Sequence, residues 1–146
     1  MFYGEYAHAL DAKSRLIIPA KFREFVKNAQ GQEKFFLTRG LDGCLFLFSE
    51  EEWRKQESKF RDLSFTSPEA RKFNRLFFSG ASEVECDAQG RILIPQYLKQ
   101  FAQIERDVML VGVSSRVEIW SKGKWREFYE NTRGSFEDTA ARIMVP

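Results

Sequence analysis

The chain carries the stretch Asp11-Ala-Lys-Ser-Arg15-Leu-Ile-Ile-Pro19, and 76 positions later it carries Asp87-Ala-Gln-Gly-Arg91-Ile-Leu-Ile-Pro95. Extended over the fifteen positions 11–25 and 87–101, the two stretches share six identical residues. Ordinary amino-acid usage gives about one match by chance. The chain therefore contains an internal duplication, and we expect its fold to consist of two similar halves.

Each copy of the duplication predicts the same order of elements. An alternating segment typical of a strand precedes a polar, turn-prone Asp-x-x-x-Arg segment, and a short apolar strand follows it. Pro19 and Pro95 then mark the start of a short helix, because proline is tolerated at the first helical position. Two further strands complete each copy. The predicted strands are residues 5–10, 16–18, 34–39 and 44–48 in the first copy, and 82–86, 92–94, 108–112 and 116–120 in the second.

Helical segments follow each copy. Ser49 and Glu52 form a predicted capping box, and Ser67-Pro68 begins a second helix that Gly80 ends. Ser121 begins a third helix, whereas the last fourteen residues are weakly patterned and predict a tail with about one helical turn. We expect four units: a first repeat at 5–50, connecting helices at 51–78, a second repeat at 79–122, and a C-terminal helix and tail at 123–146.

The size of the repeat limits the possible folds. A unit of about 45 residues cannot bury enough surface to fold alone, and two copies make neither a solenoid nor a propeller. The sequence therefore predicts an α+β, mainly β, fold in which tandem β-α-β repeats form one barrel-like core about a pseudo-two-fold axis, with flanking helices. The counterpart helix after Pro95 is predicted to bury Leu98, Phe101 and Ala102.

Charge is unevenly distributed along the chain. The net charge is only +2, but residues 1–75 hold fourteen Lys and Arg against eleven Asp and Glu. Residues 11–27 alone hold five basic and two acidic residues. This basic patch is compatible with a localised nucleic-acid contact and equally with an ordinary solvated face. The fifteen Phe predict a dense core and apolar surface for self-association.

Several function classes lack the residues they need. Cys44 and Cys86 are 42 positions apart, and His8 is the single histidine, so we expect no zinc site, other metal, cofactor or catalytic triad. No P-loop or dinucleotide motif is present, so we expect neither an enzyme nor a small-molecule substrate. The N-terminus lacks a signal peptide, and no segment has the roughly 20 apolar residues of a membrane span. We expect a soluble intracellular protein.

The duplicated Asp-x-x-x-Arg turn, followed each time by an apolar strand and proline, resembles the MraZ family over nearly the whole chain. More broadly, each copy resembles the SpoVT/AbrB domain of swapped-hairpin DNA-binding proteins. The resemblance implies a cytoplasmic, nucleoid-associated regulator that forms ring-like homo-oligomers. It also implies binding to short direct repeats in double-stranded DNA, upstream of the division and cell-wall genes that include its own gene. Lys13-Ser14 stands where many relatives have a glycine before the arginine.

Arg15 and Arg91 are the main candidates for DNA contact. An arginine at a turn can bind guanine or bridge phosphates, but each arginine could instead pair with its own aspartate and staple the turn. The DNA role is favoured for Arg15, and both roles stay open for Arg91. An antitoxin-like protein-interaction module with purely structural turns is the alternative function. The expected DNA-binding residues are Lys13, Ser14, Arg15, Lys21, Arg23 and Arg91, and the expected turn-capping residues are Asp11 and Asp87.

Overall fold

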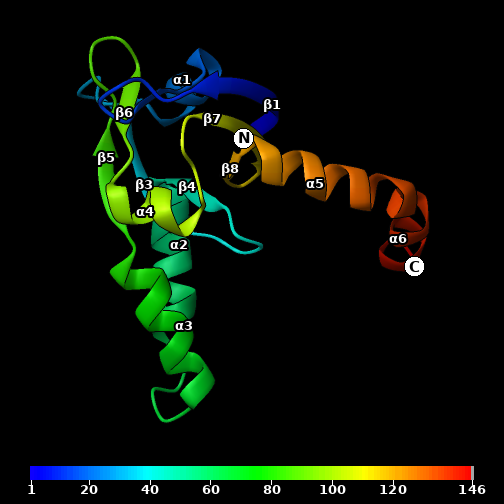
Figure 1. Cartoon of the computed structure of the whole chain (residues 1–146). Coiled ribbons are helices and arrows are strands. Elements are labelled where there is room, and N and C mark those ends of the chain that lie inside the picture. The colour runs from blue at the N-terminus through cyan, green and yellow to red at the C-terminus, as the bar shows by residue number, and fades with distance from the viewer. Residues whose placement is uncertain (146) are drawn as a thin grey trace.

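The computed structural model describes residues 1–145, and its elements follow the predicted order. The strands and the first four helices lie within a few residues of the predicted positions (Figure 1). The strands are β1 (Phe2–Ala9), β2 (Arg15–Ile17), β3 (Lys34–Arg39), β4 (Leu45–Ser49), β5 (Ser82–Glu85), β6 (Arg91–Leu93), β7 (Asp107–Ser114) and β8 (Val117–Ser121). The helices are α1 (Ala20–Val26), α2 (Glu50–Arg61), α3 (Pro68–Ser79), α4 (Gln96–Phe101), α5 (Lys122–Thr132), the 3-10 turn η1 (Arg133–Ser135) and α6 (Phe136–Ile143).

The two repeats exchange their first strands. Six strands form one antiparallel sheet in the order β1-β7-β8-β4-β3-β5. The edge strand β1 of the first repeat pairs with β7 of the second, and the edge strand β5 of the second pairs with β3 of the first. Counted inward from the two ends, equivalent strands of the two repeats occupy equivalent places: β1 and β5, then β7 and β3, then β8 and β4. Within residues 1–145, β1 and β5 are the two edge strands of this sheet. The strand order does not include a pairing between them that would close the predicted barrel.

A separate two-stranded ribbon joins the halves where their sequences match best. Strands β2 and β6 pair antiparallel, with Leu16 opposite Ile92 at the centre. Both side chains are buried, and they pack into the main core with apolar residues of the large sheet, such as Leu37 and Leu110. Because side chains alternate along a strand, the residues on either side of this central pair face outward. The ribbon therefore presents an outer face made of these flanking residues.

A second, aromatic cluster anchors helices α2 and α3 on the sheet. Trp53 of α2 stacks on Phe36 of β3, with ring centroids 5.4 Å apart, and on Phe77 of α3 at 5.5 Å. Large buried rings contribute strongly to the stability of such contacts. Figure 1 shows the α2–α3 pair extending away from the sheet below this anchor.

Two sequence-based expectations about buried and capping residues of the helices need correction. Phe101 is exposed, unlike the buried Leu98 and Ala102, and its ring lies under the Arg39 guanidinium. At the predicted capping box, Ser49 Oγ accepts from the backbone N–H of Glu52 at 3.2 Å, but the Glu52 carboxylate bonds Gln56 instead of reaching back.

The C-terminal segment is more ordered than predicted. Residues 136–143 form helix α6, where the sequence predicted a tail with about one turn. Glu137 and Asp138 occupy its first turn and Arg142 its last, so the charges complement the helix dipole. Residue 146 of the predicted unit 123–146 lies outside the described residues. No helix within residues 1–145 has the length and apolar character that crossing a bilayer requires.

Candidate nucleic-acid interface

The Asp11 carboxylate organises the first turn. Its Oδ1 accepts from the backbone N–H groups of Lys13 and Arg15, both at 2.9 Å, and its Oδ2 accepts from Arg15 Nε at 2.8 Å. Ser14 is left-handed, with φ of 61°, as the tight turn requires. Hydrogen bonding from the Arg15 backbone N–H is the main cause that lowers the pKa of Asp11. The carboxylate thus fixes both the turn and the arginine.

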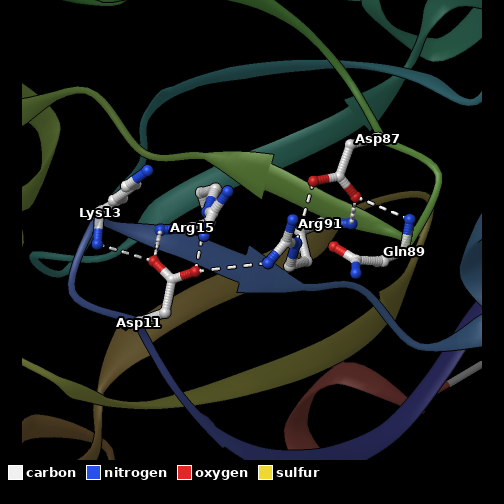
Figure 2. A network of polar contacts seen from close by, with 6 residues as sticks. All are labelled: Asp11, Lys13, Arg15, Asp87, Gln89 and Arg91. Atoms are coloured by element: carbon white, nitrogen blue, oxygen red, sulfur yellow. Dashed lines mark hydrogen bonds and ion pairs between the residues drawn. The ribbon is translucent and has the colours of Figure 1, made fainter.

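The second turn repeats this geometry (Figure 2). Asp87 Oδ1 accepts from the backbone N–H groups of Gln89 at 2.9 Å and Arg91 at 3.0 Å, and Oδ2 accepts from Arg91 Nε at 2.9 Å. Hydrogen bonding from the Arg91 backbone N–H likewise lowers the pKa of Asp87. In both turns the aspartate accepts from two backbone N–H groups, as a turn-capping residue would, and each arginine pairs with its own aspartate.

The outer face of the ribbon combines two arginines with two apolar side chains. Arg15 lies opposite Leu93, and Ile17 lies opposite Arg91, in the antiparallel register of β2 and β6. Leu93 and Ile17 are exposed, and both arginines are half-buried against the turns. Figure 2 shows the two guanidinium groups between the two aspartates, above the paired strands. We call these four side chains the ribbon face.

The two arginines differ in how firmly the protein holds them. Arg91 Nη1 lies 3.7 Å from Asp11 Oδ2, so Arg91 bridges both aspartates. Arg15 pairs with Asp11 alone among residues 1–145. The Arg15 side chain is 32% exposed and that of Arg91 is 22% exposed. Arg15 is therefore the more available of the two for an external ligand.

Each turn is also held by a helix of the other repeat. Lys99 of α4 donates from Nζ to Ser14 Oγ at 2.8 Å, and the backbone N–H of Ile94 donates to the Ser14 carbonyl. At the pseudo-equivalent place, Arg23 of α1 lies over Gly90, where an added Cβ would approach Arg23 Cζ to 2.7 Å. Sequence reasoning did not assign Lys99 to the site; it occupies the position in the second repeat that Arg23 occupies in the first, 76 residues earlier.

The structure separates the remaining basic candidates into exposed and engaged side chains. Lys13 is exposed beside the first turn, and Lys21 is exposed at the start of α1. Arg23 is engaged within the fold: its Nε donates to the Ile18 carbonyl at 3.0 Å, and its Nη1 lies 3.5 Å from Glu33. Lys13, Ser14, Arg15 and Arg91 thus gather at the ribbon, while Arg23 supports the opposite turn.

The thiols are held in their protonated forms. Desolvation by burial raises the pKa of Cys86 to about 12, and burial also raises that of Cys44. Thiolate is the reactive form of cysteine, so neither side chain is an activated nucleophile. Residues 1–145 contain no group of three or more His, Cys, Asp or Glu side chains placed to hold a metal ion.

Comparison with known protein families gives a separate match for each half of the duplicated chain. The family model described as "MraZ protein, putative antitoxin-like" matches residues 1–76 and again residues 77–145. The chain belongs to the MraZ family. Among MraZ relatives, "Transcriptional regulator MraZ" of Acetivibrio thermocellus is 53% identical over 145 residues, covering 99% of this chain and 98% of the relative. The same name is carried by proteins of a Thermoanaerobacter species, 53% identical, and of Heliobacterium modesticaldum, 47% identical. These two alignments cover 98% and 99% of this chain, and 96% and 97% of the relatives.

Proposed function

We propose that this MraZ-family chain is a transcriptional regulator that binds double-stranded DNA in a sequence-specific manner through its ribbon face. One observation carries the proposal: two equivalent Asp-x-x-x-Arg turns place Arg15 and Arg91 side by side on the outward-facing side of a two-stranded ribbon. The full-length relatives named transcriptional regulators support the same function. No catalytic role is needed to account for these residues.

The chemistry of the ribbon face suits the edges of DNA bases. A guanidinium group can donate two hydrogen bonds to O6 and N7 of guanine, and a two-stranded ribbon fits the major groove, which is about 12 Å wide. The exposed Ile17 and Leu93 offer apolar contacts to thymine methyl groups. Lys13 and Lys21 supply charge for phosphates, whose contacts fix the protein's position without reading sequence.

Self-association completes the proposal. A single ribbon carries few base contacts, so one protomer offers a weak site, and several protomers on direct repeats gain affinity through effective concentration. We therefore expect a ring-like homo-oligomer that represses transcription from direct repeats upstream of its own gene cluster, in the cytoplasm and associated with the nucleoid. The family resemblance and the exposed apolar side chains support this part of the proposal.

The second candidate is an antitoxin-like module that binds another protein. The exposed Ile17 and Leu93 favour it, because apolar side chains at the centre of a polar surface are typical of protein interfaces. In that case the arginines serve only to staple the turns. The two candidates predict different effects of removing a cation from the ribbon. Only a DNA-binding ribbon should then lose affinity for DNA.

A gel-shift titration with DNA from upstream of the protein's own gene separates the two candidates. Arg15→Ala is expected to abolish the specific shift while circular dichroism reports a folded protein. Arg75→Ala is the matched control, because Arg75 is an exposed arginine of helix α3, and Figure 1 shows that helix apart from strand β6 of the ribbon. Wild-type affinity in Arg15→Ala, or absence of any specific shift in the wild type, contradicts the proposed DNA function.

A further inference from the structure

An open apolar pocket of about 270 Å³ lies between the α2–α3 pair and the sheet. Its walls are mostly aromatic and aliphatic, and include Phe46, Phe60, Phe73, Leu76 and Phe101. Pockets for drug-sized ligands usually measure about 300–1,000 Å³. This pocket is therefore better matched to a few protein side chains than to a separate small molecule.

Two arginines border the pocket. Arg39 lies over the Phe101 ring, with Cζ 5.6 Å from its centroid, and Arg116 lies over the Phe46 ring at 4.7 Å. Arg39 also donates to the Leu76 carbonyl at 2.9 Å, and Arg116 pairs with Glu118 at 2.9 Å. Both guanidinium groups are thus fixed in place. An occupant with an apolar face and adjoining negative charge complements this surface.

Helix α6 of the same sequence has those properties. Phe136, Ala140 and Ile143 repeat at positions i, i+4 and i+7, which places them on one helical face. Phe136 is 72% exposed and Ile143 is 76% exposed. Glu137 lies in the first turn of the helix, on the flank of this apolar face. An apolar helical face left in solvent is typical of a binding surface.

The arm that carries α6 is directed away from its own body. Trp125 and Phe128 of α5 pack on Trp120 of β8, with ring centroids 5.5 and 5.3 Å apart, and this contact fixes the base of the arm. Figure 1 shows α5 and α6 extending from the sheet, well separated from the α2–α3 pair that forms one wall of the pocket. The arm therefore does not cover the pocket of its own chain.

We propose that α6 of one copy of this chain docks in the apolar pocket of the next copy. This inference rests on the self-association in the proposed function and names its interface. Phe136 and Ile143 enter the pocket, and Glu137, on the flank of the apolar face, faces the arginines Arg39 and Arg116 at its border. The contact joins two different surfaces, so each copy keeps one arm and one pocket for further neighbours. Such head-to-tail contacts produce closed rings or open filaments.

Single substitutions on each surface test the interface by light scattering coupled to gel filtration. Ile143→Asp on the arm and Leu76→Asp at the pocket each place a charge in the contact, and we expect self-association to weaken at least about tenfold, as for loss of a central interface anchor. Leu76 is 57% exposed, so the substitution leaves the fold intact. Phe65→Asp is the matched control, because Phe65 is 79% exposed between α2 and α3 and lines no part of the pocket.

Mixing the two variants tests the head-to-tail arrangement. The Leu76→Asp chain keeps its arm and the Ile143→Asp chain keeps its pocket, so their mixture is expected to form a 1:1 dimer of twice the 17.1 kDa chain mass. Failure to form that dimer overturns the inference, as does an Ile143→Asp or Leu76→Asp variant with the wild-type mass. A monomeric wild-type protein overturns the proposed self-association as well. Oligomeric Ile143→Asp protein overturns only the interface.

Discussion

Lys99 Nζ donates a 2.8 Å hydrogen bond to Ser14 Oγ across 85 positions of the chain. The contact joins helix α4 of the second repeat to the turn of the first. Its pseudo-equivalent joins Arg23 of α1 to the turn at Gly90. Each repeat therefore positions the other repeat's arginine turn. Each turn of the proposed DNA-binding surface therefore depends on contacts from both repeats.

Lys99→Met is expected to loosen the first turn without removing a phosphate contact. Loss of the bond to Ser14 should lower the free energy of unfolding by about 0.5–1.5 kcal/mol and weaken DNA binding several-fold. The salt dependence of binding reports the mechanism. A lysine that contacts phosphate contributes about 0.9 to the slope of log K against log salt concentration, whereas a positioning lysine leaves the slope unchanged. Lys72→Met on the exposed surface of α3 is the control, and a reduced slope for Lys99→Met contradicts the positioning role.

Gly90→Ala is expected to destabilise the protein more than Gly31→Ala. Both glycines have a φ of +78°, so an alanine at either position costs about 1–2 kcal/mol of backbone strain. At Gly31 the added methyl group meets no atom within 4 Å, whereas at Gly90 it would approach Arg23 Cζ to 2.7 Å. Overpacking typically adds about 1–3 kcal/mol. Urea unfolding of the two variants measures the difference, and equal losses of stability would show that Arg23 moves aside freely.

Acid is expected to weaken the turns through their aspartates. The pKa values of Asp11 and Asp87 are lowered from the ordinary 3.8, mainly by backbone N–H donors of Arg15 and Arg91. The unfolded chain therefore binds protons at a higher pH than the folded one, and the stabilisation is present above pH 3.8 and lost as pH falls through the lower folded values. Asp87→Asn should consequently lower stability at pH 7 and much less at about pH 3. Thermal unfolding at both pH values tests this prediction. A stability loss of Asp87→Asn that is larger at about pH 3 than at pH 7 would contradict it.

The sequence predicted those parts of the structure that local patterns control. The repeated Asp-x-x-x-Arg segment identified the turns, and alternation of apolar residues located the strands, because both signals lie within about ten residues. The Lys99–Ser14 and Arg91–Asp11 contacts were not predictable, since they depend on the antiparallel register of β2 and β6. Helix α6 was predicted only as a tail with about one turn, because its apolar face consists of just Phe136, Ala140 and Ile143, too short a pattern to establish a helical period.

The two cysteines are expected to resist modification while the protein is folded. Burial raises the pKa of Cys86 to about 12 and raises that of Cys44, so at pH 8 almost no thiolate forms at either site. A thiol-reactive disulfide reagent should react slowly with native protein and rapidly with both thiols in urea. A fast reaction of the native protein at pH 8 would show that the structure around one of the cysteines opens readily. Replacing each cysteine by alanine in turn assigns the phases.

The two arginines of the ribbon face are expected to contribute unequally to DNA binding. Arg91 bridges Asp87 and Asp11, so its removal leaves two carboxylates without their shared cation and loosens both turns. Arg15 has one partner among residues 1–145 and the more exposed side chain, with Lys13 exposed beside it. A bidentate arginine–guanine contact carries about 1–3 kcal/mol of discrimination. The structure thus favours recognition by Arg15 and a larger share of stability from Arg91.

Arg15→Ala should therefore nearly abolish binding to the upstream direct repeats while the free energy of unfolding changes little. Arg91→Ala should lower the free energy of unfolding more and weaken binding less at temperatures where it stays folded. In an assembly that engages several repeats at once, a loss at each protomer multiplies across the sites, which widens the gap between the variants. Titration of both variants against the repeats at two salt concentrations, with circular dichroism and urea unfolding, measures both effects. Wild-type binding by Arg15→Ala, or a greater binding loss in folded Arg91→Ala, would contradict the asymmetry.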